Sequence, residues 1–235
     1  MDTHLRAAIE GSRADTLLVF LPGAFFRPDE FEREGFVRAV RARHLAADVM
    51  LVDASVSCYY DQSFIERLNA GVIEAQRARG YKSIWLVGVS IGGFGALIHE
   101  LARPGHVDGI VALAPYLGRR PLGAEIFKAG GLRKWKVPDG PAPDKEADRR
   151  LWPWLQQYAN PVASRRLPPL YLGYGLGDRF ARNHRLLADV LPAGRVFTTE
   201  GGHDWPQWSR LWRQMLEVLP LPVRPPAAHP AAIAA

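Results

Sequence analysis

A serine between two glycines is the strongest chemical signal in the sequence. Residues 88–92 read Gly-Val-Ser-Ile-Gly, the pattern G-x-S-x-G, in which a tight turn raises the serine hydroxyl above the end of a strand. An apolar run at 84–87 predicts that strand, and the small residues at 92–96 predict the start of a helix. Glycines two positions before and after the serine avoid a collision across the turn. We therefore predict that Ser90 is a nucleophile; the alternative is a glycine-rich turn in which Ser90 caps the helix.

His203 is the candidate base. A serine hydroxyl is a weak nucleophile until a neighbouring base accepts its proton. His203 lies in the sequence Glu-Gly-Gly-His-Asp-Trp at 200–205, between the last predicted strand and the closing helix. The other histidines are predicted within helices, before a strand or near the chain ends. Position in the fold therefore favours His203 as the partner of Ser90.

Asp178 is the candidate acid. A carboxylate must orient the imidazole and stabilise its positive charge. Asp178 follows the fifth predicted strand, and the chain order Ser90, Asp178, His203 is one of the three known orders of such a triad. Asp178 can also serve as the cap of the helix that follows it. Asp53, after the second predicted strand, is the weaker alternative acid, whereas Asp204 is too close in sequence to His203 to face it.

Two backbone N–H groups are expected to bind the negative charge that develops on the carbonyl oxygen. The first belongs to Ile91, the residue after the nucleophile. The second should come from the loop Leu-Pro-Gly-Ala-Phe at 21–25, where Gly23 permits a sharp turn. We predict Ala24 as this donor and Phe25 as the second choice; the alternative is a plain Pro-Gly turn.

The elements that must position these groups alternate along the chain. Short apolar runs separated by amphipathic stretches indicate strand–helix–strand units, so we predict an α/β fold with a mostly parallel sheet of about six strands and helices on both faces. The predicted strands are 16–21, 48–52, 84–88, 107–114, 170–174 and 195–199, and the predicted helices are 31–43, 63–79, 96–101, 180–190 and 205–219.

The order of the nucleophile turn, the acid after a strand, the late histidine and the first-strand loop resembles that of the α/β-hydrolases over about residues 16–219. The sequence Gly-Gly-His-Asp-Trp-Pro-Gln-Trp at 201–208 is similar to the esterase D-like branch of small carboxylesterases. The resemblance implies a serine esterase or thioesterase, with one hydrolase domain at 1–219. The chain begins almost directly at the strand that family members number third, which implies that the first two are missing. Leu-Pro-Gly also stands where many relatives have His-Gly.

Residues 116–160 interrupt the alternation where family members commonly insert a cap. The segment carries nine cations and five anions. This excess favours an anionic substrate; the alternative is a solvated charged loop. Aromatic side chains in the cap and after the second strand are the candidate substrate-binding residues. They are Tyr59, Tyr60, Tyr116, Trp135, Trp152 and Trp154.

Composition excludes several other classes. The formal net charge is +6 without a clustered basic motif, so no nucleic-acid partner is predicted. The single cysteine, Cys58, excludes a disulfide framework and a cysteine-built zinc site. No metal or cofactor motif is present. The start lacks the pattern of a signal peptide, and no apolar run is long enough to span a membrane, so we expect a cytoplasmic protein. The Pro/Ala-rich tail at 220–235 is expected to be disordered.

These observations predict a cofactor-free serine hydrolase of small carboxylic esters or thioesters. Three alternatives stay open: an acyltransferase with the same residues, a peptidase, and a non-catalytic interaction protein on the same scaffold. The acyl chain, the leaving group and the oligomeric state stay open as well.

Overall fold

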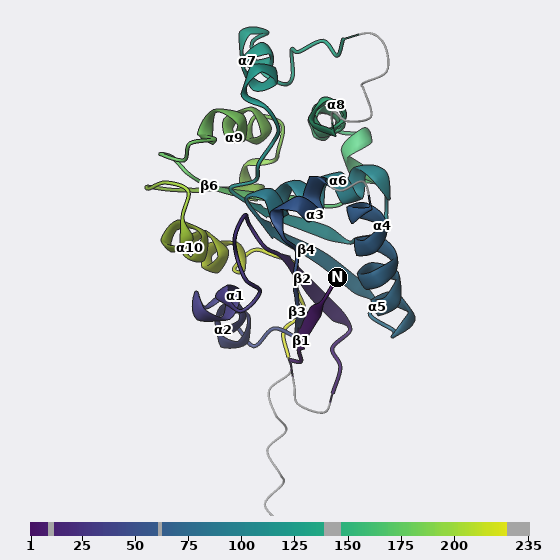
Figure 1. Cartoon of the computed structure of the whole chain (residues 1–235). Helices are drawn as coiled ribbons and strands as arrows, with labels where there is room; N and C mark the ends of the chain where they lie inside the picture. Colours follow the sequence, from purple (N-terminus) through teal and green to yellow (C-terminus); the bar gives the residue numbers. More distant parts are fainter. Residues whose placement is uncertain (9–11, 61–62, 139–146, 225–235) are drawn as a thin grey trace, which may run out of the picture.

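A seven-stranded sheet lies between two layers of helices in the computed structural model, which describes residues 1–8, 12–60, 63–138 and 147–224 (Figure 1). The strand order is β1-β3-β2-β4-β5-β6-β7, with β1 antiparallel to β3 and the other neighbours parallel. The prediction of an α/β fold with helices on both faces is confirmed. The strands are β1 Thr3–Arg6, β2 Thr16–Leu21, β3 Ala47–Val52, β4 Ser83–Val89, β5 Gly109–Leu113, β6 Leu170–Gly175 and β7 Val196–Thr199.

The prediction of about six strands misses β1. This strand pairs with the outer edge of β3, from Thr3 opposite Val52 to Arg6 opposite Val49. Its side chains are mostly exposed, and backbone hydrogen bonds hold it in place. Such a short, polar edge strand has no apolar run from which it can be predicted. The implied absence of both strands that precede this one in the family is therefore wrong in part, because one antiparallel strand is present before the strand at 16–21.

The central strands are buried on both faces and feed two separate cores. In β2, Leu18 and Phe20 face a core built with α1 Glu30–Arg33, α2 Phe36–Ala42 and α10 Trp205–Met215. Leu17, Val19 and Leu21 face the opposite core, because successive side chains of a strand point to opposite faces. The helices of that second layer nearest the sheet are α3 Val56–Tyr60, α4 Phe64–Leu68, α5 Ala75–Ala78 and α6 Ile91–Ala102 (Figure 1).

Two predicted helices are interrupted. The predicted helix at 31–43 is split into α1 and α2 by Gly35, whose φ of +79° lies in the left-handed region that glycine adopts without strain. The predicted helix at 63–79 contains a π-helical turn, η1 Asn69–Glu74, between α4 and α5. Asn69 is buried there, and its side-chain oxygen lies 2.8 Å from Nδ1 of His106. The π-helical turn thus comes with a side-chain contact between residues that are distant in sequence. Hydrophobic periodicity cannot predict such a contact.

The described parts of the segment at 116–160, residues 116–138 and 147–160, lie beyond the carboxyl ends of the strands (Figure 1). It contains α7 Arg120–Lys128 and α8 Ala147–Gln156, followed by the 3-10 turn η2 Gln157–Ala159. Residues 139–146 of the predicted cap lie outside the described part. The remaining elements are the 3-10 turns η3 Ala163–Arg166 and η4 Ala193–Arg195, and the helix α9 Ala181–Ala188. The bounds of the cap stay a prediction.

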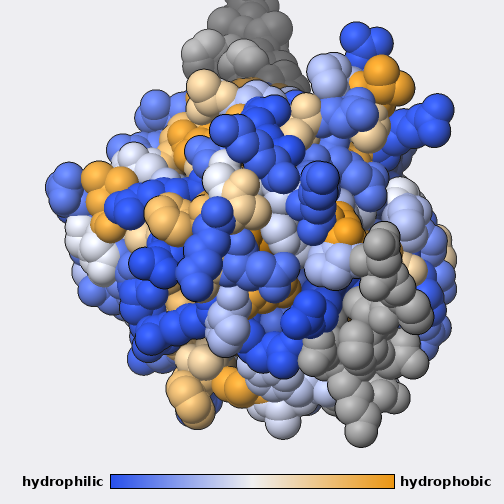
Figure 2. All heavy atoms as spheres, turned by 90° about the horizontal axis from the view of Figure 1, so that it is seen from above, coloured by the Kyte–Doolittle hydropathy of each residue, from blue (hydrophilic) through white to orange (hydrophobic). Residues whose placement is uncertain are grey.

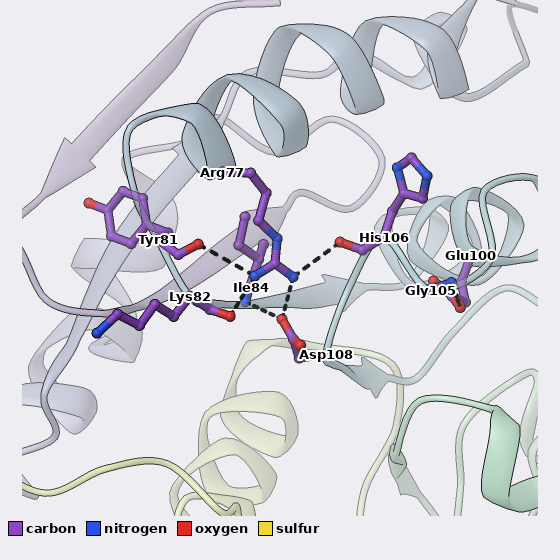
Figure 3. Close-up of polar contacts among 8 residues, drawn as sticks. All are labelled: Arg77, Tyr81, Lys82, Ile84, Glu100, Gly105, His106 and Asp108. Atoms are coloured by element: carbon purple, nitrogen blue, oxygen red, sulfur yellow. Dashed lines mark hydrogen bonds and ion pairs between the residues drawn. The ribbon is translucent and has the colours of Figure 1, made fainter.

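A hydrogen-bonded cluster around Arg77 lies at the amino ends of β4 and β5. The guanidinium of Arg77 donates hydrogen bonds to the carboxylate of Asp108 and to the backbone carbonyl of Lys82 (Figure 3). Asp108 also accepts the backbone N–H of Ile84 at 2.7 Å. This cluster ties the end of α5 to the starts of β4 and β5, at the opposite end from the nucleophile turn.

The first residues of the predicted disordered tail are packed. Leu221 is buried, and Pro222 accepts a hydrogen bond from the N–H of Ala46. Val223 forms a β-bridge with Leu45. The prediction of disorder is therefore wrong for residues 220–224, because backbone pairing that composition does not reveal holds them. The rest of the tail, 225–235, lies outside the described residues.

Candidate functional site

The turn after β4 has the geometry that the glycine pattern predicts. Ser90 has a φ of +55° and a ψ of −115°, a conformation that non-glycine residues rarely adopt. A Cβ atom on Gly88 would overlap the backbone of Gly92, and one on Gly92 would overlap that of Leu21. The Ser90 N–H donates to the carbonyl of Leu113 in β5 at 2.9 Å. Both glycines are therefore required for the close approach of strand, turn and helix.

Ser90, His203 and Asp178 form one hydrogen-bonded line. The Ser90 Oγ lies 2.9 Å from Nε2 of His203, and Nδ1 of His203 lies 2.7 Å from Oδ2 of Asp178. With a neutral ring protonated on Nδ1, His203 donates to the carboxylate and accepts the serine hydroxyl proton. The structure thus brings together the three side chains that the sequence analysis selected, from three different strand ends.

Asp178 is buried and stays charged because of its hydrogen bonds. Burial alone would raise the pKa of this carboxyl, but the His203 ring and the backbone N–H of Phe180, which lies 2.7 Å from Oδ1, more than offset that effect. The pKa of Asp178 is therefore lower than its ordinary value. Asp178 also fulfils part of the predicted capping role, since its side chain binds the N–H of Phe180, the residue that precedes α9.

Two aromatic rings pack edge-to-face against the imidazole of His203. The ring of Trp208 is perpendicular to that of His203 at 5.0 Å between centroids, and Phe180 makes a similar contact at 5.2 Å. Trp208 also contacts Phe26 of the loop after β2, at 5.5 Å. None of these three aromatic residues was a predicted site residue. Trp208 is the last residue of the motif at 201–208, whereas Phe26 and Phe180 are marked only by their position next to or near predicted site residues.

The candidate oxyanion donors lie on the two segments expected. Ile91 is the first residue of α6, where a helix leaves its backbone N–H without an intrahelical acceptor. The loop after β2 is anchored by the hydroxyl of Tyr59, which donates to the carbonyl of Pro22 at 2.8 Å. Phe25 is 94% exposed with a φ of +63°. The roles of Ile91, Ala24 and Phe25 in binding an oxyanion stay predictions.

The predicted substrate-binding aromatics divide into two groups. Tyr116 and Tyr60 reach the surface beside the site: Tyr116 is half-buried with its ring 5.8 Å from Phe180, and Tyr60 is 65% exposed. Tyr59 is buried, and its hydroxyl is used on the loop after β2. Tyr59 therefore positions that loop, and its contact with a substrate stays a prediction.

The three predicted tryptophans of the cap are core residues. Trp152 is fully buried, and Trp135 and Trp154 are buried with it in the core that α6 shares with α7 and α8. The indole N–H of Trp135 donates to Glu125 at 2.9 Å. Trp152, which is 0% exposed, packs in this core and is not the wall of an open pocket. Trp135 and Trp154 are 5% and 6% exposed, comparable with Ser90 at 7%, so their contact with a substrate stays a prediction.

The rejected acids lie elsewhere. Asp53 is exposed at the end of β3, where its backbone N–H binds the carbonyl of Asp2. Asp204 is exposed and precedes α10. Neither carboxylate makes a hydrogen bond to His203 among the residues that the structure describes, whereas Asp178 does.

The described residues contain neither a cluster able to hold a metal ion nor a membrane-spanning helix. No three His, Cys, Asp or Glu side chains in that part of the chain gather in a group able to hold a metal ion. None of the helices there combines the length and the apolar character needed to cross a bilayer.

Comparison with known proteins identifies the family. Residues 18–234 match the model of the alpha/beta hydrolase family. A search of curated protein sequences gave no significant match. Solved structures with the same fold include the fluorophosphonate-binding serine hydrolase F (FphF) of Staphylococcus aureus, at 14% identity and a TM-score of 0.60, covering 89% of this chain and 86% of that one.

Two further structures have similar scores. The S-formylglutathione hydrolase FrmB of Staphylococcus aureus has 14% identity and a TM-score of 0.57, with 88% of this chain and 82% of that chain covered. The monoacylglycerol lipase of Paleococcus ferrophilus has 14% identity and a TM-score of 0.59, with 92% and 97% covered. At such identities the likeness concerns the fold, and it agrees with the family model. The chain belongs to the alpha/beta hydrolase family.

Proposed function

We propose that this protein is a serine hydrolase that cleaves carboxylic esters or thioesters through an acyl-enzyme on Ser90. The observation that carries the proposal is the hydrogen-bonded line from Ser90 through His203 to Asp178. A fold alone does not define a chemistry, because one scaffold serves many reactions. Ser90 lies on a strained turn, and His203 and Asp178 follow it in the order of a hydrogen-bonded triad. This arrangement is the one that catalyses acyl transfer in serine hydrolases.

The reaction has two halves. In the first, the Ser90 oxygen attacks the acyl carbon while Nε2 of His203 takes the hydroxyl proton. The resulting tetrahedral intermediate collapses, the bond to the leaving group breaks, and His203 gives its proton to the departing alcohol or thiol. In the second, water attacks the acyl-enzyme, His203 takes and returns a proton, and the carboxylic acid leaves with Ser90 regenerated.

Asp178 and the backbone donors act on charge that develops during the reaction. When His203 becomes positively charged, the carboxylate of Asp178 stabilises it and keeps the ring oriented. The N–H groups of Ile91 and Ala24, with Phe25 as the second choice, bind the negative oxygen of the tetrahedral intermediate. We also propose that residues 116–160 act as the cap, and that Tyr60 and Tyr116 contact the substrate at its rim.

The test is covalent labelling followed by turnover. A fluorophosphonate probe reacts with an activated serine, so the wild type should gain the mass of one phosphonyl group on the peptide containing Ser90. The Ser90→Ala variant should remain unlabelled, fold with an unchanged circular-dichroism spectrum, and lose p-nitrophenyl ester turnover by at least about 10³-fold. Ser164→Ala, at a serine whose hydroxyl binds the Pro161 carbonyl, is the matched control and should label and turn over as the wild type does. Parental turnover by Ser90→Ala would refute the assignment.

Product analysis separates hydrolysis from its rivals. An acyltransferase would use the same side chains but pass the acyl group to an alcohol or thiol in preference to water. Free acid should therefore remain the main product when an alcohol or thiol acceptor is added. Amide turnover would indicate a peptidase, and absence of labelling would favour an interaction protein.

A further inference from the structure

Arg179 carries a positive charge to the edge of the proposed active site. It directly follows Asp178 and is exposed. The Cζ atom of its guanidinium lies 5.0 Å from the centre of the Phe180 ring, and that ring contacts His203 at 5.2 Å between centroids. The cation therefore lies one aromatic ring away from the imidazole. A cation over an aromatic face is attracted by the ring, which favours this placement of the guanidinium.

Within the described residues, no carboxylate is paired with the Arg179 guanidinium. Both oxygens of Asp178 are already occupied, by His203 and by the backbone N–H of Phe180. In the part of the chain that the structure describes, Arg179 forms no ion pair. The exposed acids nearest along the site-forming loops, Glu200 and Asp204, do not pair with it either. The guanidinium is therefore available to an anion from solution.

Arg119 of the cap differs from Arg179 in this respect. Arg119 binds the buried carboxylate of Asp148 with its Nε at 3.0 Å, and the Arg119 backbone N–H binds the same oxygen. Its charge is thus used to join the start of α7 to the start of α8. The general excess of cations in the cap does not by itself point to the site, whereas the position of Arg179 does.

We propose that Arg179 makes the enzyme prefer esters that carry an anionic group a few bonds from the reacting carbonyl. This inference rests on the proposed function and names its substrate class: half-esters of dicarboxylic acids, or esters with an acidic leaving group. The guanidinium binds the carboxylate of the substrate while Ser90 attacks the ester carbonyl. Seen from above, the molecule is mainly hydrophilic, with separate small apolar patches (Figure 2).

The experiment compares paired substrates that differ at one group, which is anionic in one member and neutral in the other. On the acyl side the pair is mono-p-nitrophenyl adipate and p-nitrophenyl hexanoate. On the leaving-group side it is the acetyl ester of 3-hydroxybenzoate and that of its methyl ester. In Arg179→Gln, kcat/KM for the anionic member of at least one pair should fall about fivefold, the size of an exposed ion pair, with the neutral member within about twofold. The pair that responds identifies the side of the substrate that carries the anion.

Three controls keep the test sharp. Arg179→Lys keeps the charge and should retain most of the preference. Arg182→Gln removes a neighbouring cation of α9 that lies over Phe127 of α7, 5.2 Å from the ring centre, and should leave the preference unchanged. Raising the salt concentration should reduce the wild-type preference, because an exposed ion pair is screened.

Failure of this inference and failure of the proposed function look different. Equal losses on both members of each pair, an unchanged preference in Arg179→Gln, or an equal effect of Arg182→Gln would overturn the role of Arg179. In those cases the neutral esters are still cleaved. Absence of turnover on all four esters by the wild type would instead contradict the hydrolase assignment.

Discussion

Two buried carboxyl groups, Asp178 and Glu100, have pKa values shifted in opposite directions. They are 5% and 2% exposed, so both have lost most of their water. Asp178 accepts hydrogen bonds on each oxygen, and its pKa is lowered. Glu100 accepts the N–H of Gly105 on Oε1, whereas Oε2 has no close partner among the residues that the structure describes (Figure 3). Burial outweighs the effect of the backbone N–H groups of Gly105 and Val107 and raises the pKa of Glu100 to about 7.

The difference shows that burial alone does not determine charge. A buried carboxylate stays ionised where donors surround it and takes up a proton where they do not. The signs for stability follow. The stabilisation from ionised Asp178 is present at neutral pH and is lost as the pH falls through its lowered pKa. Glu100 costs nothing while protonated, and its cost grows as the pH rises from about 4.5 to about 7.

The largest expected effect comes from removing the charge of Asp178. In Asp178→Asn the amide no longer stabilises the positive imidazole and disfavours the required tautomer of His203. We expect kcat for a p-nitrophenyl ester to fall about 10⁴-fold, as the same change does in a protease triad. Steady-state kinetics on the folded variant measure this. A loss of only a few-fold would show that another carboxylate supports His203.

The three candidate catalytic side chains were accessible to sequence analysis because each has a local signal. Ser90 lies between glycines that the turn requires, Asp178 follows the apolar run of β6, and His203 follows the short β-branched and aromatic strand β7. Parallel strands bring their carboxyl ends to one edge, so residues far apart in sequence are expected to meet there. The central strands could be predicted for the same reason.

What sequence analysis missed depends on contacts between distant segments. Strand β1 is held by backbone pairing with β3, and the tail residue Val223 by pairing with Leu45. The contact of Phe26 with Trp208 joins the loop after β2 to α10, two segments far apart in sequence. Trp152 reads equally well as a core or a pocket residue until the packing of α8 on α6 is known. None of these contacts leaves a periodic pattern in the sequence.

A smaller effect, on stability only, is expected at Glu100. Gln cannot ionise, so Glu100→Gln should remove the cost of charging this site. The difference between the pKa of about 7 and the ordinary 4.5 corresponds to about 3 kcal/mol in the free energy of unfolding above pH 7, and to none below about pH 4.5. Urea unfolding of both proteins from pH 4.5 to 8.5 measures it, and ester turnover at neutral pH should stay the same.

The control for Glu100 is an exposed glutamate on a neighbouring helix. Glu66 pairs with Arg103 at the surface, and its side chain is 61% exposed. Glu66→Gln should change the free energy of unfolding by no more than about 1 kcal/mol at any pH in this range. If the free energy of unfolding depends on pH in the same way for the wild type and Glu100→Gln, Glu100 has no raised pKa in the folded protein. The contrast with Asp178 would then not hold.

The smallest effect is expected at Asp53, the carboxylate that sequence order alone leaves as an alternative acid. Asp53 follows a parallel strand, as Asp178 does, but its side chain is exposed and makes no hydrogen bond to His203. Because water already solvates it, Asp53→Asn should leave kcat and KM within about twofold of the wild type, against the 10⁴-fold loss in Asp178→Asn. A large loss in both variants would mean that carboxylates at two strand ends share the histidine. The same kinetic measurement on the two variants thus tests whether position after a strand is enough for the acid role, or whether burial with two donors is also required.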